Sequence, residues 1–284
     1  MMESDTFLRR DDFIVSYQAQ TGWGFGIALD FFFSGTGAAL FLFSSIFHSS
    51  PGIILSLVFV AIGVLTLFLD LGTPWRFFKV FARLKTSWIS RGSLFIALLF
   101  VFGIIYALIG FPILSWFWMI IFGAIAILVM LYPGMVISYS PSITVWNSQF
   151  TPILLSLHSL TSGLSIISMI QPSLVEKSGS LVWLQLGLLL LLLIGAAIYL
   201  TVSYASAAGV RESIRLLAKG SAGLSFYLLG IGIGIILPMI FLFAFLGGGL
   251  SPWGLLPVAC ITRLVGDLGF RYAILKIGLY DPHL

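Results

Sequence analysis

The chain has 284 residues, of which 60% are hydrophobic and 8% are charged, and its formal net charge is +4. Soluble domains carry about 25% charged residues, so this composition excludes a soluble globular protein, whose surface must stay hydrated. The single cysteine, Cys260, excludes internal disulfides and cysteine-ligated clusters, and its apolar surroundings predict a buried packing residue.

Long apolar blocks predict an all-α integral membrane protein. A helix needs about 20 apolar residues to cross roughly 30 Å of hydrocarbon, and the stretch from Gly92 to Val175 contains no Lys, Arg, Asp or Glu. Segments rich in proline, glycine and serine divide the blocks. We predict eight transmembrane helices, arranged as two four-helix bundles, at 23–47, 52–71, 92–112, 115–138, 151–171, 180–204, 222–246 and 253–277.

Short polar segments flank this predicted transmembrane domain, which covers 23–277. An N-terminal segment over 1–22 precedes it, and a short tail over 278–284 follows it. The first segment lacks a basic stretch followed by an apolar one, so no cleavable signal peptide is predicted and the first span itself directs insertion.

Basic residues are distributed very unevenly between the two faces of the predicted bundle. Eight spans place both termini on one face, and that face takes eleven of the fourteen Lys and Arg residues: Arg9, Arg10, Arg76, Lys79, Arg83, Lys85, Arg91, Arg211, Arg215, Lys219 and Lys276. The other face takes Lys177. The positive-inside rule therefore predicts a plasma-membrane protein with both termini in the cytoplasm. Arg83, Lys85, Arg211 and Arg215 also form a candidate docking surface for an acidic partner.

Asp30 is the most informative ionisable residue, because it lies within the first span. It is about seven residues, or roughly 10 Å, below the terminal face. A carboxylate at this depth must be paired, hydrated or protonated, and such a group can accept and release protons. The alternative interpretation is a structural aspartate held by an arginine or by backbone N–H groups.

Two further groups of charges lie in or beside the predicted spans. Asp70, at the end of the second span, precedes Arg76 and Arg91, which favours structural ion pairs. Arg263, Asp267 and Arg271 recur at i, i+4 spacing and so share one face of the last span. A structural triad, a proton or water path, and a clamp for a polar head group all remain open for this face.

The histidines argue against a haem protein. The chain has His48, His158 and His283, whereas the two haems of a typical cytochrome b quinol oxidase need paired axial histidines. A single haem on His48 and His158 is the remaining alternative, although the serines beside His158 favour a hydrogen-bonded core residue. No metal-ligand spacing occurs, so we expect neither haem nor metal.

Tyr132 precedes Pro133 and Gly134 within the fourth span. Proline interrupts the regular helical hydrogen bonds and glycine opens space. A hydroxyl at such a break is well placed to bind a ligand carbonyl, and ordinary packing is the alternative.

Several motifs together resemble the NrfD/PsrC family, the haem-free membrane subunits of complex iron–sulfur oxidoreductases. The first span reads Trp23-Gly24-Phe25-Gly26-Ile27-Ala28-Leu29-Asp30. The most specific pair is Leu69-Asp70-Leu71-Gly72-Thr73-Pro74-Trp75-Arg76-Phe77 followed by Thr86-Ser87-Trp88-Ile89-Ser90-Arg91-Gly92. Trp146-Asn147-Ser148 and Gly266-Asp267-Leu268, with Arg271 and Lys276, are also similar.

The resemblance implies a membrane anchor that exchanges electrons between a quinone, either menaquinone or ubiquinone, and a peripheral four-cluster iron–sulfur subunit. A molybdopterin catalytic subunit is the further implied partner; no nucleic acid is expected. In polysulfide reductase anchors a first-span histidine and a fourth-span tyrosine line the quinone pocket. Asp30 stands in the place of that histidine and Tyr132 is similar to the tyrosine; Trp23 and Ile27 are expected beside them. An aspartate accepts protons well, which favours quinol oxidation.

A second functional class also fits these residues. Asp30, Asp70, Arg263 and Asp267 could form a proton path in a secondary transporter or ion-translocating subunit, with the Tyr132-Pro133 break near a midplane site. Co-purification with an iron–sulfur protein favours the anchor. Solute movement by the chain alone favours the transporter.

Overall fold

The computed structural model describes residues 17–70, 74–109, 116–177, 179–218, 220–248 and 252–280. Most of the predicted segment over 1–22 and the end of the tail over 278–284 lie outside these residues. The same holds for Leu71, Gly72 and Thr73 of the most specific motif, and for the side chain of Arg76.

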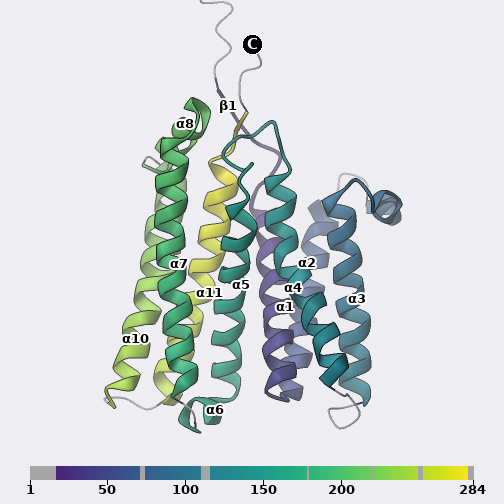
Figure 1. The fold of residues 1–284 in the computed structure, drawn as a ribbon, viewed down its shortest axis with the longest axis vertical. Helices are drawn as coiled ribbons and strands as arrows, with labels where there is room; N and C mark the ends of the chain where they lie inside the picture. Colours follow the sequence, from purple (N-terminus) through teal and green to yellow (C-terminus); the bar gives the residue numbers. More distant parts are fainter. Residues whose placement is uncertain are drawn as a thin grey trace, which may run out of the picture.

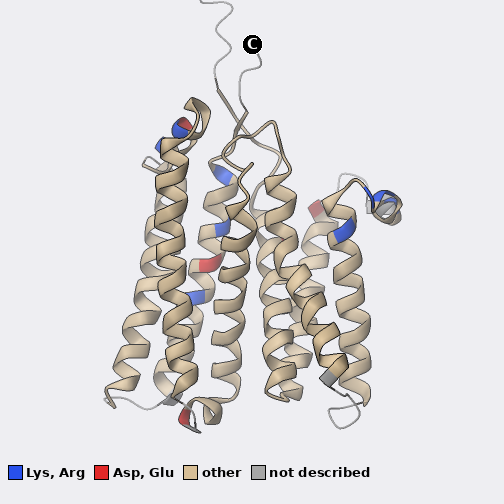
Figure 2. Cartoon of the chain, in the orientation of Figure 1, with Lys and Arg blue, Asp and Glu red and all other residues tan. Residues whose placement is uncertain are grey.

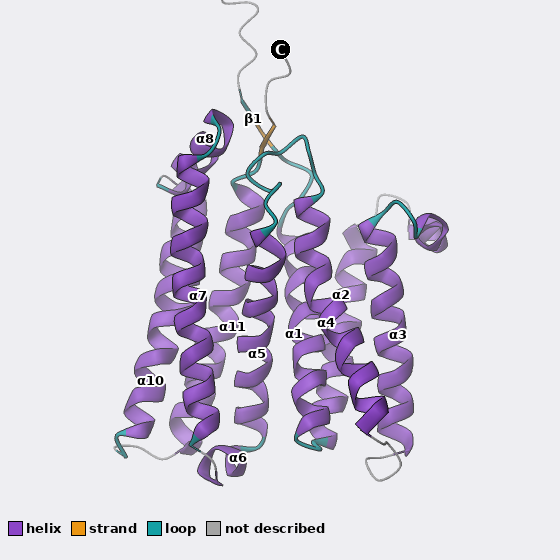
Figure 3. Ribbon diagram, viewed as in Figure 1, coloured by secondary structure: helices purple, strands orange, loops and turns teal. Residues whose placement is uncertain are grey.

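The described chain is almost entirely helical (Figure 3). In chain order the helices are α1 (Phe25–Ile46), α2 (Ser50–Asp70), the 3-10 helix η2 (Pro74–Arg83), α3 (Trp88–Ile109), α4 (Trp116–Ser138), α5 (Phe150–Ile170), α6 (Pro172–Lys177), α7 (Ser180–Ala205), α8 (Ala208–Leu217), α9 (Gly220–Gly223), the π-helix η4 (Leu224–Ile236), α10 (Leu237–Leu246) and α11 (Pro252–Lys276). Two short strands, β1 (Gln18–Ala19) and β2 (Leu279–Tyr280), pair in antiparallel fashion.

Seven helical stretches of the described residues are long and apolar enough to cross a membrane: α1, α2, α3, α4, α5, α7 and the continuous run α9–η4–α10 over Gly220–Leu246. They coincide with the first seven predicted spans to within a few residues, so those seven are confirmed. The predicted eighth span corresponds to α11, which has 25 residues. It is not among the seven stretches of the described residues that meet the criteria of length and apolar composition.

The long helices stand side by side, and α1 lies at the centre of the arrangement (Figure 1). It packs against α2, α4, α5 and α11, while α3 packs against α4 and α2. Small residues allow this close approach: a side chain on Gly37 would clash with Val60 of α2, and one on Gly163 of α5 would clash with Ala39. The remaining helices, α7 and η4–α10, pack around α5 and α11.

The described ends of the chain meet at one end of the helices. Gln18 pairs with Tyr280 and Ala19 with Leu279, and the Gln20 amide donates to the Leu275 carbonyl at 2.9 Å. We call this the terminal end. Most Lys and Arg residues lie there, on η2, α8 and the adjoining ends of α3 and α11, while a second group lies along α11 inside the molecule (Figure 2).

Candidate functional site

Asp30 and Tyr132, which are 102 positions apart in the sequence, meet in the interior of the protein. The Tyr132 hydroxyl donates a hydrogen bond to Oδ2 of Asp30 at 3.1 Å. Asp30 has no exposed surface and Tyr132 is 2% exposed. The contact between α1 and α4 therefore joins an acid to a phenol, and both side chains are buried.

Packing against α3 and α1 fixes the position of the Tyr132 ring. An ideal Cβ on Gly92 of α3 would lie 1.9 Å from Cδ2 of the ring, so only glycine leaves room there. The Phe31 ring meets Tyr132 edge to face, with 6.1 Å between centroids. Two residues after Tyr132, Gly134 approaches Pro152 of α5 so closely that its Cβ would lie 2.2 Å from the proline Cα.

The predicted break at Pro133 does not occur, because α4 continues through it to Ser138. A proline removes one backbone N–H from the helix, and neighbouring helices can stabilise such a residue in a transmembrane segment. Tyr132 is therefore held by packing against α3 and α1, and not by a helix end.

The second oxygen of Asp30 is the unusual feature of the site. Oδ1 is buried and receives no hydrogen bond from any described residue. Leaving a buried polar oxygen without a donor costs about 1–3 kcal/mol, and more when it is charged. A ligand hydroxyl at this position would supply the missing donor.

A cavity of about 310 Å³ opens at the terminal end, between the ends of α3 and α4 and the residues that precede α1. Its lining includes Trp23, Ser87, Trp88, Val136 and Tyr139. Val136 is one helical turn, roughly 6 Å, from Tyr132. Neither Asp30 nor Tyr132 is among the described lining residues of this cavity, and Val136 is the lining residue nearest to Tyr132 along α4.

Aromatic and basic side chains form the rim of this cavity. The rings of Trp88 and Tyr139 are 5.5 Å apart, and the Arg91 guanidinium lies 4.6 Å above the Trp88 ring. Arg91 also donates to the carbonyls of Leu84 and Lys85. Its described contacts are thus carbonyls and an aromatic ring, whereas the sequence suggested an ion pair or a proton path.

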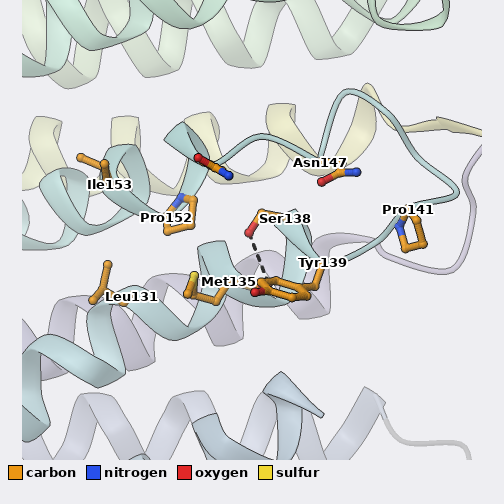
Figure 4. A pocket seen from close by; sticks show the side chains of 9 residues that line it. Leu131, Met135, Ser138, Tyr139, Pro141, Asn147, Pro152 and Ile153 are labelled. Carbon is orange, nitrogen blue, oxygen red and sulfur yellow. Dashed lines mark hydrogen bonds between the residues drawn. The ribbon is translucent and has the colours of Figure 1, made fainter. Parts of the chain in front are cut away.

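A larger cavity of about 630 Å³ lies between α4 and α5 on the other side of Tyr139 (Figure 4). Leu131, Met135, Pro152 and Ile153 line its deeper part. Its described lining includes no carboxylate and no basic side chain, so it offers no proton acceptor. The smaller cavity is the better candidate for chemistry.

The other residues predicted for the quinone pocket lie above or beside the pair. Trp23 lines the cavity, and its ring contacts Phe31 at 6.3 Å and Trp146 at 5.3 Å between centroids. Ile27 is partly buried against the same core. The Asp70 carboxylate lies against Gly26, which is one turn from Asp30 on α1. A Cβ added to Gly26 would lie 3.0 Å from Oδ1 of Asp70.

A second polar centre lies on α11, where Arg263, Asp267 and Arg271 are all at most 1% exposed. Arg271 joins three helices. Its Nε donates to Oδ1 of Asp267 at 2.7 Å, its Nη1 to the Phe31 carbonyl of α1 at 2.9 Å, and its Nη2 to Oγ of Ser159 on α5 at 2.9 Å. The predicted common face of these charges therefore points into the protein.

His158 and Ser162 of α5 complete this centre. Ser162 donates to Oδ2 of Asp267 at 2.7 Å, and Arg263 donates to Nδ1 of His158 at 2.6 Å. Because a guanidinium can only donate, Nδ1 accepts here and the ring proton is assigned to Nε2. His158 is thus a hydrogen-bonded core residue, as the neighbouring serines suggested.

Arg263 also bonds the backbone of a neighbouring helix. Its Nη1 donates to the Gly234 carbonyl of the π-helix η4 at 2.7 Å. Gly234 and Gly266 allow the close approach, because a Cβ on Gly266 would lie 2.0 Å from the Gly234 Cα.

The family model described as "Polysulphide reductase, NrfD" matches residues 16–281, which is nearly the whole chain. No curated protein matches the sequence.

Proposed function

Because the chain belongs to the NrfD family of multi-pass membrane subunits of polysulphide reductase-type complexes, we propose that it oxidises quinol at the Asp30–Tyr132 pair and passes the electrons to a partner. The observation that carries this proposal is the Asp30 carboxylate. It is fully buried, it is held at Oδ2 by Tyr132, and its Oδ1 has no described hydrogen-bond donor.

A quinol hydroxyl supplies what Oδ1 lacks. In the oxidation of quinol to quinone, two protons and two electrons leave the ring. Asp30 as a carboxylate accepts the proton of one hydroxyl at Oδ1, while Tyr132 keeps the carboxyl group oriented through Oδ2. The other hydroxyl releases its proton to solvent at the terminal end. Trp23 and Ile27 give the ring an apolar and aromatic approach from the terminal end. Menaquinol and ubiquinol both fit this chemistry.

The electrons need an acceptor on another chain. Iron–sulfur clusters are held by several cysteine thiolates, and this chain has one cysteine. We assign the acceptor role to a peripheral four-cluster iron–sulfur subunit, which in turn serves a molybdopterin catalytic subunit. We assign its docking surface to Arg83 and Lys85, at and just after the end of η2, and to Arg211 and Arg215 of α8. Both elements lie at the terminal end, where the cavity lined by Trp23 and Val136 opens (Figure 2).

The membrane topology that follows has eight spans. We assign α11 as the eighth, because its three central charges are buried against α1, α5 and η4, so that they do not face lipid. The helices α1–α4 then form one four-helix bundle, and α5, α7, η4–α10 and α11 form the other. The basic terminal end faces the cytoplasm.

An ion-translocating role is the second candidate, and the buried polar centre on α11 is the observation that favours it. Both carboxylate oxygens of Asp267 already accept hydrogen bonds, from Arg271 and Ser162. That arrangement suits a structural centre better than a carrier of protons. Asp30, with its unpartnered oxygen, has the more suitable group for proton transfer.

Isolation of the intact complex from native membranes tests the proposal. We expect the chain to co-purify with an iron–sulfur protein whose clusters become reduced when quinol is added, as followed by electron paramagnetic resonance. A chain that purifies without redox partners and moves a solute in proteoliposomes would identify a transporter instead.

Replacing Gly92 with alanine tests the position of Tyr132. The added Cβ would lie 1.9 Å from the ring, so the ring must shift and its hydroxyl must leave its place at Asp30. We expect quinol oxidation to fall about 10- to 100-fold, because misplacement by about 1 Å has effects of this size. Gly187→Ala on α7 is the matched control, since nothing lies within 4 Å of its Cβ. Equal activities in the two variants would contradict the proposed role of the ring.

Cysteine labelling tests the orientation in the membrane. The native Cys260 is buried, so a maleimide applied to intact cells should report mainly on an introduced cysteine. We expect Glu176→Cys, near the α6 end of the molecule, to react from outside and Arg83→Cys to react only after the cells are broken. The reverse pattern would place the terminal end outside the cell.

A further inference from the structure

The cavity of about 630 Å³ between α4 and α5 is polar at one end and apolar at the other (Figure 4). Its polar end lies at the terminal end of the two helices, where Ser138 closes α4 and where Asn147 and Gln149 precede α5. Its apolar end is lined by Leu131 of α4 and Ile153 of α5. The lining therefore changes from hydrogen-bonding to hydrocarbon side chains within a single cavity.

This change follows the long axes of two helices that are long and apolar enough to cross a membrane. Leu131 is seven residues, or roughly 10 Å, below Ser138 along α4. Tyr139, which lines the polar end and is 66% exposed, belongs to the residue types that gather where head groups meet hydrocarbon. The polar end therefore lies at the level of the lipid head groups, and the apolar end lies within the hydrocarbon.

The apolar end of the cavity is open to the lipid. Ile153 is 52% exposed and Leu131 is only partly buried. A volume of about 630 Å³ falls within the range of roughly 300–1,000 Å³ that small-molecule sites have. The cavity can therefore hold a lipid head group together with the first part of a chain that continues into the membrane.

The polar end of the cavity is uncharged. Its described lining includes the amides of Asn147 and Gln149 and the hydroxyls of Ser138 and Tyr139, and it includes no acidic or basic side chain. Amides and hydroxyls can donate hydrogen bonds to phosphate and ester oxygens. The first turn of the 21-residue helix α5 has no acidic residue, so the positive end of the helix dipole adds to this attraction. These groups suit phosphate and ester oxygens without selecting the charge of the head group.

We propose that this cavity is a binding site for one phospholipid. Its phosphate and glycerol esters lie at Asn147 and Gln149, and one acyl chain passes between Leu131 and Ile153. The lipid fills the joint between α4 and α5, on the other side of Tyr139 from the smaller cavity. A quinol is the poorer occupant, because it must give up protons and the described lining offers no acid or base. The inference does not depend on quinol oxidation at Asp30.

Filling the apolar end tests this assignment. Leu131→Trp places a larger ring in the cavity, and Ile120→Trp, at a position of α4 that is 60% exposed, is the matched control. The measurement is native mass spectrometry of the purified complex titrated with phosphatidylethanolamine. We expect Leu131→Trp to weaken the tightest binding about tenfold, which is the effect of losing the burial of about two methylene groups. Ile120→Trp should change it by less than about twofold, and equal affinities in the two variants would overturn the proposal.

Gln149→Leu tests the polar end at an exposed position. Loss of one hydrogen bond should weaken phospholipid binding about three- to tenfold. Because the described lining carries no charge, phosphatidylglycerol and phosphatidylethanolamine should bind with affinities within about threefold of each other. A preference of tenfold or more for the anionic lipid would place the lipid at a basic surface and contradict this site.

Photolabelling of the wild-type complex gives a readout that does not depend on a folded variant. A phospholipid with a diazirine near the start of one acyl chain should label peptides that contain 131–138 and 149–153. Excess unlabelled phospholipid should prevent this labelling, whereas excess long-chain quinone should not. Labelling that quinone removes would identify a quinone site, and labelling spread evenly over the lipid-facing helices would show contact with bulk lipid alone. Either result would overturn the assignment.

Discussion

Asp30→Asn should lower quinol oxidation by the complex about 100-fold or more, which is the range that a positioned acid–base group contributes. Asparagine has nearly the same shape and keeps an oxygen that can accept the hydrogen bond from Tyr132, now seen at 3.1 Å. It cannot accept a proton from the quinol, because an amide is not a base near neutral pH. The fold should persist, since the substitution removes a buried charge.

The measurement is the rate at which quinol reduces the iron–sulfur clusters, compared at equal amounts of assembled complex. Tyr132→Phe is the companion variant, because it removes the hydroxyl and keeps the ring against Gly92 and Phe31. We expect a smaller loss in Tyr132→Phe than in Asp30→Asn. Unchanged quinol kinetics in Asp30→Asn would rule out proton transfer to this residue.

Arg271→Leu should prevent accumulation of the folded protein. Arg271 is the closest cationic partner of the buried Asp267, at 2.7 Å, and it also satisfies the Phe31 carbonyl and Ser159. Removing one member of a buried ion pair costs about 3–5 kcal/mol, which is a large part of a typical total stability of about 5–15 kcal/mol. The measurements are the yield in membranes and the thermal unfolding of detergent-solubilised protein.

Arg215→Leu is the matched control for this loss of a guanidinium. Arg215 pairs with Glu212 at 3.0 Å, but both side chains are largely exposed, at 64% and 41%. Exposed pairs contribute about 0–1 kcal/mol, so this variant should accumulate normally. Asp267→Asn combined with Arg271→Leu should recover part of the lost stability, because the unpaired carboxylate is gone. If Arg271→Leu and Arg215→Leu are equally stable, α11 is not held by this ion pair.

Several features followed from the sequence alone because they depend on one helix at a time. The length of an apolar block is sufficient to predict a spanning helix, and the seven helices of the described chain with that character lie where the sequence placed them. The i, i+4 spacing of Arg263, Asp267 and Arg271 was enough to put them on one face of α11. The loop motifs around Asp70 and Arg91 were enough to indicate the family.

Contacts between helices were decided by the tertiary structure. Asp30 was recognisable as a costly charge, but its hydrogen bond to Tyr132 depends on α1 and α4 being neighbours. The contacts of Gly92 with the Tyr132 ring and of Gly63 with the Asp30 backbone depend on α3 and α2 packing beside α4 and α1. His158 was predicted as a core residue, yet its bond to Arg263 could not be named.

The physical reason for this division is the nature of helix packing in a membrane. Hydropathy determines whether a segment spans the membrane, and helical periodicity determines which of its faces is polar. Which helices become neighbours depends on the fit of small residues and on hydrogen bonds between segments far apart in the chain. The sequence therefore determined a charge-poor helical bundle with one deep carboxylate, and the tertiary structure decided which groups surround that carboxylate and which of its oxygens lacks a described donor.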